Sequence, residues 1–334
     1  MNKVLSGIII VAIVALTTRI LLFSGILMRN PGGFFQVDSY GYWQIAENII
    51  NHNSFSSSNN MPLMPNHSRT PLYPLFISSL SWFGLNAPGI IFIQILLSSV
   101  TCILVIFLTY ALTGNWKPAF LAGGIIAVDI PSVVLSNCLL TETLFTFLLT
   151  FSILFLVFNL KAQKKSLTLC YSGILMGFSI LCRPIAVFLP IFVIILLLLF
   201  SRTTKLYLFN RIFLYLFFCF LTVSPWLVRN QVVFGSPFLS TIGYKSLLYY
   251  RAAGVYSMKE GISISKSQEI LRKKARSAFQ GNIKHEPIEY MKFEAKIASS
   301  IIMENPLIYI RNHILSVFNM LFKPMRSTID LQMG

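Results

Sequence analysis

A long uncharged segment constrains this chain more than any other feature of its sequence. Residues 70–116, which are 47 in a row, contain no Asp, Glu, Lys or Arg. A helix needs roughly 20 apolar residues to cross a bilayer, so this segment has room for more than one crossing. Charged residues make up only 11% of the 334-residue chain; soluble domains carry roughly a quarter. The sequence therefore predicts an all-α, polytopic membrane protein.

About seven apolar segments have the length and composition of membrane spans. They lie at about 4–28, 89–112, 118–135, 138–160, 166–182, 184–200 and 212–228. The first segment should be a signal anchor rather than a cleaved signal peptide, because its apolar run exceeds the usual core of roughly 7 to 15 residues. The segment 71–83 is also apolar, but it is short and contains two prolines. An interfacial or re-entrant piece is expected there.

Basic residues in the short loops predict the orientation, because Lys and Arg are retained on the cytoplasmic side. With the N-terminus inside, the cytoplasmic residues would be Lys3, Lys117, Lys161, Lys164, Lys165, Arg202, Lys205 and Arg211. The outer side would then receive the first long loop, 29–88, and the tail, 231–334. We expect a transmembrane module at 1–230 and an extracytoplasmic basic tail at 231–334, in a bacterial inner membrane.

Two parts of the outer side should form helices at the membrane surface. Between about 39 and 51, apolar residues recur at helical spacing with polar residues on the other face, which predicts a short amphipathic helix. Asp38 stands at its start. In the tail, 289–322 has the pattern of amphipathic helices interrupted at Asn305–Pro306.

The basic charge does not indicate nucleic acid. The net charge is +16, but the basic residues are spread over short loops and the tail rather than gathered in one stripe. Anionic lipid headgroups or phosphate-bearing substrates are the expected partners. The five cysteines lie in apolar segments without metal or redox spacing, which is typical of packing residues.

Ionisable residues are costly at membrane depth, and in this sequence they gather near one boundary. In the predicted topology the residues at or near the outer face are Asp38, Glu142, Arg69, Arg183 and Arg229. Two carboxylates and three guanidinium groups around one helix bundle would form a polar cavity. The scarcity of other acids makes Asp38 the first candidate for a general base.

Each of these residues also has a purely structural interpretation. Asp38 could accept a proton from a hydroxyl, or it could only cap the helix that follows it. Glu142 could belong to the site, or it could simply be favoured by the dipole of the helix that it begins. Arg183 and Arg229 could grip a substrate phosphate or anchor to headgroup phosphates. Arg19 could extend to the membrane surface or pair with Asp38.

Several short motifs follow one another in a recognisable order between about 38 and 236. They are Val37-Asp38-Ser39-Tyr40-Gly41-Tyr42-Trp43-Gln44-Ile45-Ala46, Arg69-Thr70-Pro71-Leu72-Tyr73-Pro74, Thr141-Glu142-Thr143-Leu144-Phe145, Cys182-Arg183-Pro184 and Pro225-Trp226-Leu227-Val228-Arg229-Asn230. In this order the motifs resemble those of the GT-C membrane glycosyltransferases. The nearest group resembles the one that contains protein O-mannosyltransferases and lipid A aminoarabinose transferase.

This resemblance implies a polyprenyl-phosphate-linked sugar as donor and a glycan, lipid or protein as acceptor. It implies that Asp38 is the general base of an inverting transfer on the outer face, and that cations hold the carrier phosphate. The expected substrate- and carrier-binding residues are Arg69, Arg183, Arg229, Glu142, Tyr40 and Tyr73. No metal ligands are predicted. Protein O-mannosyltransferases have Asp-Glu where this chain has Asp38-Ser39, and a need for a divalent cation stays open.

Other functions fit the same sequence features. A transporter or flippase for lipid-linked glycans could use a basic, aromatic-rich cavity, although transporters often show two similar halves and this sequence shows none. A non-catalytic protein that binds lipid-linked sugar is the other alternative. Family members usually continue through further membrane helices, so a short, fragmentary or inactive relative is also an expectation.

Overall fold

The computed structural model describes residues 2–162, 166–200, 204–283, 286–322 and 332. Over these residues the regular elements are helices, and one isolated β-bridge joins Ser56 to Pro65. The prediction of an all-α chain is confirmed. Contacts divide the described residues into two compact units. The first holds those of Met1–Asn66, Thr70–Arg229 and Met325–Gly334, and the second holds those of His67–Arg69 and Asn230–Pro324.

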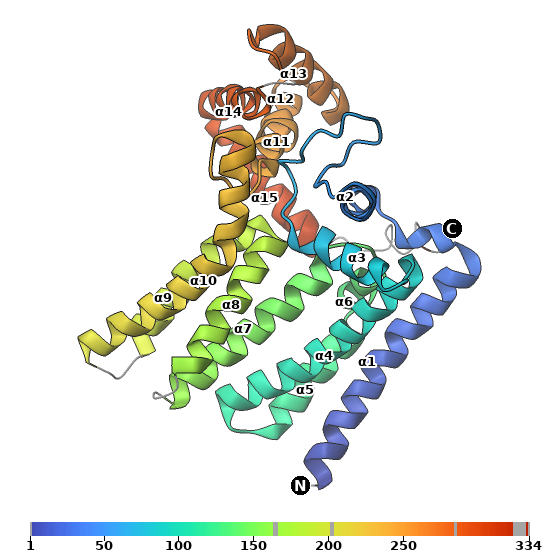
Figure 1. Cartoon of the computed structure of the whole chain (residues 1–334), viewed down its shortest axis with the longest axis vertical. Coiled ribbons are helices and arrows are strands. Elements are labelled where there is room, and N and C mark those ends of the chain that lie inside the picture. Colours follow the sequence, from blue (N-terminus) through green and yellow to red (C-terminus); the bar gives the residue numbers. More distant parts are fainter. Residues whose placement is uncertain (1, 163–165, 201–203, 284–285, 323–331, 333–334) are drawn as a thin grey trace. The chain divides into compact units, whose positions relative to one another are not determined.

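The first unit consists mainly of long apolar helices (Figure 1). In chain order they are α1 (Asn2–Arg29), η1 (Pro31–Phe34), α2 (Val37–His52), α3 (Leu72–Trp82), α4 (Ala87–Thr113), α5 (Trp116–Val128), α6 (Ile130–Ser136), α7 (Glu142–Ala162), α8 (Ser166–Cys182), η2 (Pro184–Phe188), α9 (Leu189–Phe200) and α10 (Lys205–Phe234). The last residues of α10 belong to the second unit.

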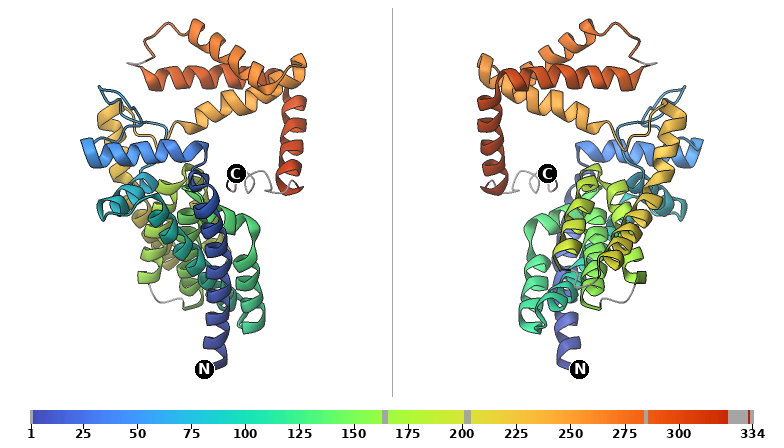
Figure 2. Two further views of the ribbon diagram at one scale, coloured as in Figure 1. Left: turned by 90° about the vertical axis from the view of Figure 1, so that its right-hand side faces the viewer. Right: turned by 90° about the vertical axis from the view of Figure 1, so that its left-hand side faces the viewer.

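The long helices of the first unit pack alongside one another. α1 contacts α4 and α5, α4 contacts α7, and α7 contacts α8. The N-terminus, the α4–α5 turn and the start of α10 lie at one end of this bundle, whereas α2 and α3 lie at the other end (Figures 1 and 2). The bundle therefore has two different ends, and the helices of the first long loop cover one of them.

Fewer helices than predicted meet the length and hydropathy criteria for a membrane span. Among the described residues, four helices are long and apolar enough to cross a bilayer: Lys3–Arg29, Ala87–Thr113, Glu142–Lys161 and Lys205–Phe234. A fifth span results if α5 and α6, which bend by 54° at their junction, count together. The remaining helices α8 and α9 have 17 and 12 residues, fewer than the roughly 20 that a full crossing needs. The expected count of about seven is therefore not reached by these criteria.

The bend between α5 and α6 has a local cause. Pro131 has no N–H to donate to the Ala127 carbonyl four residues earlier, so the helix cannot continue regularly. Asp129 then caps the new helix, because its Oδ2 accepts hydrogen bonds from Ser132 N at 2.9 Å and Ser132 Oγ at 2.6 Å. The predicted span at 118–135 is thus broken at Asp129, and its end leaves carbonyl groups that need other donors.

Arg19 of α1 supplies these donors. Its side chain is fully buried, and its guanidinium donates to the Ala127 carbonyl at 3.0 Å and the Ile126 carbonyl at 3.3 Å. Its Nε also donates to Ser98 Oγ on α4 at 2.8 Å. Neither of the two expectations for Arg19 describes this arrangement. The guanidinium instead caps the C-terminal end of α5, where a helix dipole favours positive charge.

Two glycines bring α8 and α10 together. A Cβ atom at Gly173 would lie 2.5 Å from the Tyr215 carbonyl oxygen, and one at Gly177 would lie 2.6 Å from Thr222 Cβ. Real Cβ atoms essentially never approach other atoms so closely, so both positions require glycine at this separation. Spaced four residues apart, the two glycines form the small-residue pattern that lets membrane helices pack closely.

The second unit is built from shorter helices. They are α11 (Ile242–Ser246), the π-helical η3 (Leu247–Ala252), α12 (Ala253–Glu260), α13 (Ile264–Ala278), α14 (Pro287–Glu304) and α15 (Pro306–Phe322). Leu248, Ala252, Leu271, Ala298 and Ile301 belong to the buried core that holds them together. The predicted interruption at Asn305–Pro306 is confirmed, because α14 ends and α15 begins there.

Candidate functional site

The predicted surface helix exists, but Asp38 does not cap it. α2 begins at Val37, and its N-cap residue is Gln36, whose side chain and that of Ser39 form a reciprocal capping box. Gln36 N donates to Ser39 Oγ at 2.9 Å. Asp38 therefore lies in the first turn, one residue inside the helix, and its side chain is exposed. The alternative in which Asp38 serves as the N-cap is wrong, because Gln36 and Ser39 already satisfy the capping positions.

Aromatic side chains surround this first turn. The ring of Phe35 lies 5.2 Å from that of Tyr40 and 5.6 Å from that of Trp43, measured between centroids. Trp43 Nε1 donates to Glu47 Oε1 at 2.8 Å, so Glu47 is held along the helix. Tyr40, one of the predicted binding residues, is 63% exposed. An exposed carboxylate beside exposed aromatic surface is an arrangement in which a sugar can be bound and its attacking hydroxyl deprotonated.

Glu142 and Arg183, two of the predicted site residues, contact each other directly. Glu142 is the first residue of α7, and Arg183 follows the last residue of α8. Arg183 Nη1 lies 2.5 Å from Glu142 Oε1, with about a third of each side chain exposed. The Arg183 guanidinium also lies over the ring of Phe145, 5.9 Å from its centroid. Because a guanidinium has five N–H donors, this ion pair leaves donors for a second anion.

Tyr73 takes a supporting position. Its side chain is fully buried, and its hydroxyl donates to Gln94 Oε1 of α4 at 2.6 Å. Gln94 in turn donates to the Cys138 carbonyl at 2.7 Å, and the ring of Tyr42 packs edge-on against that of Tyr73. This chain of contacts links α2, α3, α4 and the segment before α7. A direct role for Tyr73 toward the carrier stays a prediction.

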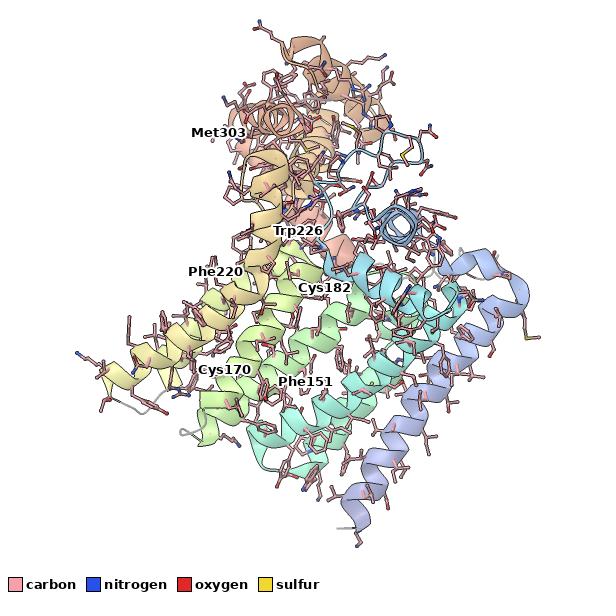
Figure 3. All side chains as sticks on the ribbon, in the orientation of Figure 1. Phe151, Cys170, Cys182, Phe220, Trp226 and Met303 are labelled. Atoms are coloured by element: carbon pink, nitrogen blue, oxygen red, sulfur yellow. The ribbon has the colours of Figure 1, made fainter. Side chains whose placement is uncertain are left out.

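One buried cluster carries the elements on which four of the predicted residues lie. Its buried members include Ala46 of α2, Tyr73 of α3, Leu144 of α7 and Cys182 of α8; Figure 3 labels Cys182 at the end of α8. Tyr42, Trp43 and Phe145 pack against this cluster. Helix α2, which carries Asp38 in its first turn, therefore shares one hydrophobic core with the start of α7 at Glu142 and the end of α8 next to Arg183.

Arg229 is held against the first loop. Its Nη1 donates to the Asn66 carbonyl at 3.2 Å, and its guanidinium lies 4.8 Å from the ring centroid of Trp226 and 5.5 Å from that of Phe55. Trp226, which is labelled in Figure 3, is buried and packs edge-on against Phe55. Arg69, by contrast, is half-buried and belongs to the second unit. Arg229 thus connects α10 to the segment that precedes the Arg69 motif.

Glu142 also lines a small cavity among the helices. The cavity has a volume of about 200 Å³. Its wall carries a series of hydroxyl side chains, and they are Ser98, Thr101, Ser132, Thr143, Thr146 and Thr150. Such a wall is unusual between apolar helices, where polar side chains normally face a cavity or one another. Sequence reasoning did not single out these residues; the recurrence of Thr at 143, 146 and 150 on α7 is the signal that could have found them.

The described residues contain no cluster of side chains that could bind a metal ion. Within those residues no group of three or more His, Cys, Asp or Glu side chains is placed to hold a metal ion. His67 lies near Thr241, with 2.7 Å between its Nδ1 and Thr241 Oγ1. The five cysteines are free thiols.

Comparison with known protein families gives one match. Residues 68–228 match the family described as dolichyl-phosphate-mannose-protein mannosyltransferase. No curated protein sequence matches the chain. The matched segment includes Arg69, Tyr73, Glu142 and Arg183, whereas Asp38 precedes it and Arg229 follows directly after it. Residues 68–228, just under half of the chain, are therefore similar to the family of dolichyl-phosphate-mannose-protein mannosyltransferases.

Proposed function

We propose that this protein transfers a sugar from a polyprenyl-phosphate carrier to an acceptor hydroxyl, with Asp38 as the general base. The acceptor oxygen forms a bond to the anomeric carbon while the bond from that carbon to the carrier phosphate breaks. The hydroxyl proton passes to Asp38, and the electron pair leaves with the polyprenyl phosphate. Attack from the side opposite the leaving group inverts the anomeric configuration.

The observation that carries this proposal is the position of Asp38. Its side chain is exposed in the first turn of α2, one residue inside a helix whose N-cap is Gln36. α2 packs on the same hydrophobic cluster as the ends of α7 and α8 that hold Glu142 and Arg183. A base and a cation on one packed core can act on the two sides of a sugar that is being transferred.

The cations stabilise the leaving group. Charge develops on the carrier phosphate as its bond to the sugar breaks, and guanidinium groups that are already oriented stabilise this charge without reorganising. Arg183 is oriented by Glu142 and Phe145, and Arg229 by the Asn66 carbonyl and the ring of Trp226. We assign both to the carrier phosphate, with Tyr40 and Tyr73 as further contacts, while the predicted role of Arg69 stays a prediction from the sequence alone.

The same proposal includes a topology of seven crossings with the site on the outer face. Three of these seven crossings are shorter or less regular than a full span. The first is formed by α5 together with α6, the second by α8, and the third by η2 together with α9. Packed beside longer helices, helices of this length can cross where the bilayer thins locally. Lys3, Lys117 and Lys205 then belong to the end of the bundle opposite α2 and α3, which is the distribution that the cytoplasmic side favours.

The test is Asp38→Asn in the purified full chain, reconstituted in vesicles with polyprenyl-phosphate mannose as donor. Loss of a general base should lower the rate of sugar release from the donor by about 100-fold or more. Binding of the donor, measured by co-sedimentation with labelled lipid, should be retained. A transporter or a non-catalytic binding protein would show neither transfer in the wild type nor a difference between the two proteins.

Glu47→Gln is the matched control. Glu47 is the other carboxylate of α2, and a glutamine there can still accept the hydrogen bond from Trp43. This variant should keep the wild-type rate. Unchanged sugar release by Asp38→Asn would contradict the proposed mechanism, and equal losses in both variants would show that the overall charge of α2 matters instead.

A further inference from the structure

The second unit contains a larger cavity than the one at Glu142. Its volume is about 710 Å³, against about 200 Å³ for the cavity at Glu142. Residues from α11, η3, α13 and α14 line it, together with His67. A volume of this size lies within the range of roughly 300 to 1,000 Å³ that small-molecule sites occupy. The proposed transfer does not use these residues, so their arrangement has to be explained separately.

Basic side chains form one side of this cavity. Lys245, Arg272 and Arg276 all line it and are exposed. Arg272 and Arg276 lie one turn apart on α13, where two like charges destabilise a helix. Their neighbour Lys273 is paired with Glu269 at 2.8 Å and does not line the cavity. Two adjacent guanidinium groups that face the same space are suited to a bidentate anion such as phosphate or carboxylate.

A buried carboxylate lies on the other side. The side chain of Glu294 is 1% exposed, and its Oε1 accepts a hydrogen bond from the Tyr249 hydroxyl at 2.5 Å. Its Oε2 is buried and accepts no hydrogen bond of normal geometry from the described residues, although the Tyr290 hydroxyl lies close to both Glu294 and Tyr249. Buried polar atoms are normally satisfied, so this carboxylate oxygen marks a place for a ligand with hydroxyl groups. The carboxylate oxygen can only accept, which requires a donor on that ligand.

Tyr249 joins the two sides. The guanidinium of Arg272 lies over its ring, 5.4 Å from the centroid, and Gln268 Nε2 donates to its backbone carbonyl at 2.7 Å. Burial, followed by the hydrogen bond to Glu294, raises the pKa of the Tyr249 phenol above its ordinary value. The phenol therefore stays protonated at neutral pH and continues to donate to Glu294. Its ring offers an apolar face of the kind on which sugar rings pack.

We infer that this cavity binds an anionic saccharide, a sugar that carries a phosphate or carboxylate group. The anionic group contacts Arg272 and Arg276, with Lys245 near them. The sugar hydroxyls donate to Glu294 Oε2 and bond with Tyr290. This binding does not depend on the proposed function.

The test measures binding of small probes to the full chain in nanodiscs by isothermal titration calorimetry. Mannose 6-phosphate and glucuronate provide the two anionic groups, while mannose and inorganic phosphate each provide half of the proposed ligand. Both anionic sugars should bind at least tenfold more tightly than mannose or inorganic phosphate. Inorganic phosphate that binds as tightly as mannose 6-phosphate would overturn the assignment to a saccharide.

Two double variants on α13 separate the site from general surface charge. Arg272→Gln with Arg276→Gln should raise the Kd for both anionic sugars at least tenfold. Lys273→Gln with Lys274→Gln removes the same charge from the same helix at exposed positions that do not line the cavity, and it should leave the Kd unchanged. Equal weakening by the two double variants would overturn the proposal, since the attraction would then be nonspecific.

Glu294→Gln tests the hydroxyl contact. The glutamine oxygen can still accept from Tyr249, but the group at the Oε2 position becomes a donor, so affinity for both anionic sugars should fall at least tenfold. Asp38→Asn should bind the probes like the wild type even if transfer is lost. If the wild type transfers sugar but does not bind the probes, this inference alone is wrong. If it binds the probes but does not transfer sugar, only the proposed function is wrong.

Discussion

Arg19 shows how a single charged residue can be satisfied inside an apolar bundle. Among the described residues its guanidinium forms no ion pair with a carboxylate; it donates instead to carbonyls at the end of α5 and to Ser98 of α4. These guanidinium N–H groups replace the backbone N–H donors that the carbonyls at the end of α5 lose because of Pro131 and the bend. A residue that looked like a candidate for the polar site from sequence thus has a structural role.

Arg19→Met should destabilise the bundle. Methionine fills a similar volume but leaves the Ile126 and Ala127 carbonyls without these donors, and each buried unsatisfied group costs about 1–3 kcal/mol. The free energy of unfolding should fall by at least about 2 kcal/mol on that scale, as measured by denaturant titration in detergent. Arg19→Lys, which keeps a donor on a long side chain, should lose less. An unchanged stability in Arg19→Met would mean that these carbonyls are satisfied in another way.

Arg183 offers a prediction on the reaction itself. A hydrogen bond to a charged group contributes about 1.5–3 kcal/mol, so Arg183→Gln should raise the KM for the polyprenyl-phosphate donor about tenfold or more. Initial rates at varied donor concentration measure this change. Lys117→Gln removes a positive charge near the start of α5, at the other end of the bundle, and should leave KM unchanged. A lower KM in Arg183→Gln would show that the arginine serves Glu142 rather than the phosphate.

At the scale of elements, the contact between α8 and α10 depends on backbone approach. Gly173 and Gly177 stand where any side chain would collide with the backbone or a side chain of α10. Sequence reasoning registered α8 only as an apolar segment, although the spacing of its two glycines is a known packing signal. The spacing alone does not say which helix packs against the two glycines, and the structure identifies that helix as α10.

Gly177→Ala should push α8 and α10 apart. The new Cβ would lie 2.6 Å from Thr222 Cβ and 2.9 Å from the Cys219 carbonyl oxygen, and overpacking of this kind typically costs about 1–3 kcal/mol. The melting temperature in detergent should fall accordingly. Gly124→Ala on α5 is the control, because nothing lies within 4 Å of its Cβ position. That variant should be neutral or slightly stabilising, since alanine favours helix more than glycine.

At the scale of the whole molecule, the orientation in the membrane can be tested by labelling. Ser57→Cys and Lys117→Cys, made separately in a cysteine-free background, place a thiol at exposed positions in the first loop and near the α4–α5 turn. The native cysteines lie in or beside helices and are mostly buried, so their replacement is feasible. A membrane-impermeant maleimide should label the Ser57→Cys variant from outside in intact cells, and the Lys117→Cys variant only after permeabilisation. Labelling of both from the same side would refute the proposed topology.

The sequence by itself determined the features that depend on neighbouring residues. Hydropathy predicted the all-α membrane class, periodicity predicted the helix that became α2, and Asn305–Pro306 predicted the break before α15. The ordered motifs predicted a resemblance to the same family to which residues 68–228 are similar. These properties are local because they follow from side-chain polarity and backbone propensity along one segment.

Only the tertiary structure decided which distant groups meet. The pairing of Glu142 with Arg183, the capping of α5 by Arg19 and the partly unsatisfied Glu294 in a basic cavity all join residues far apart in the chain. It also divided the predicted span 184–200 into η2 and α9, and it placed Gln36 rather than Asp38 at the cap of α2. Hydrophobicity is nondirectional and can be summed along a sequence, but hydrogen bonds and ion pairs require specific atoms within about 3 to 4 Å, and only folding brings those atoms together.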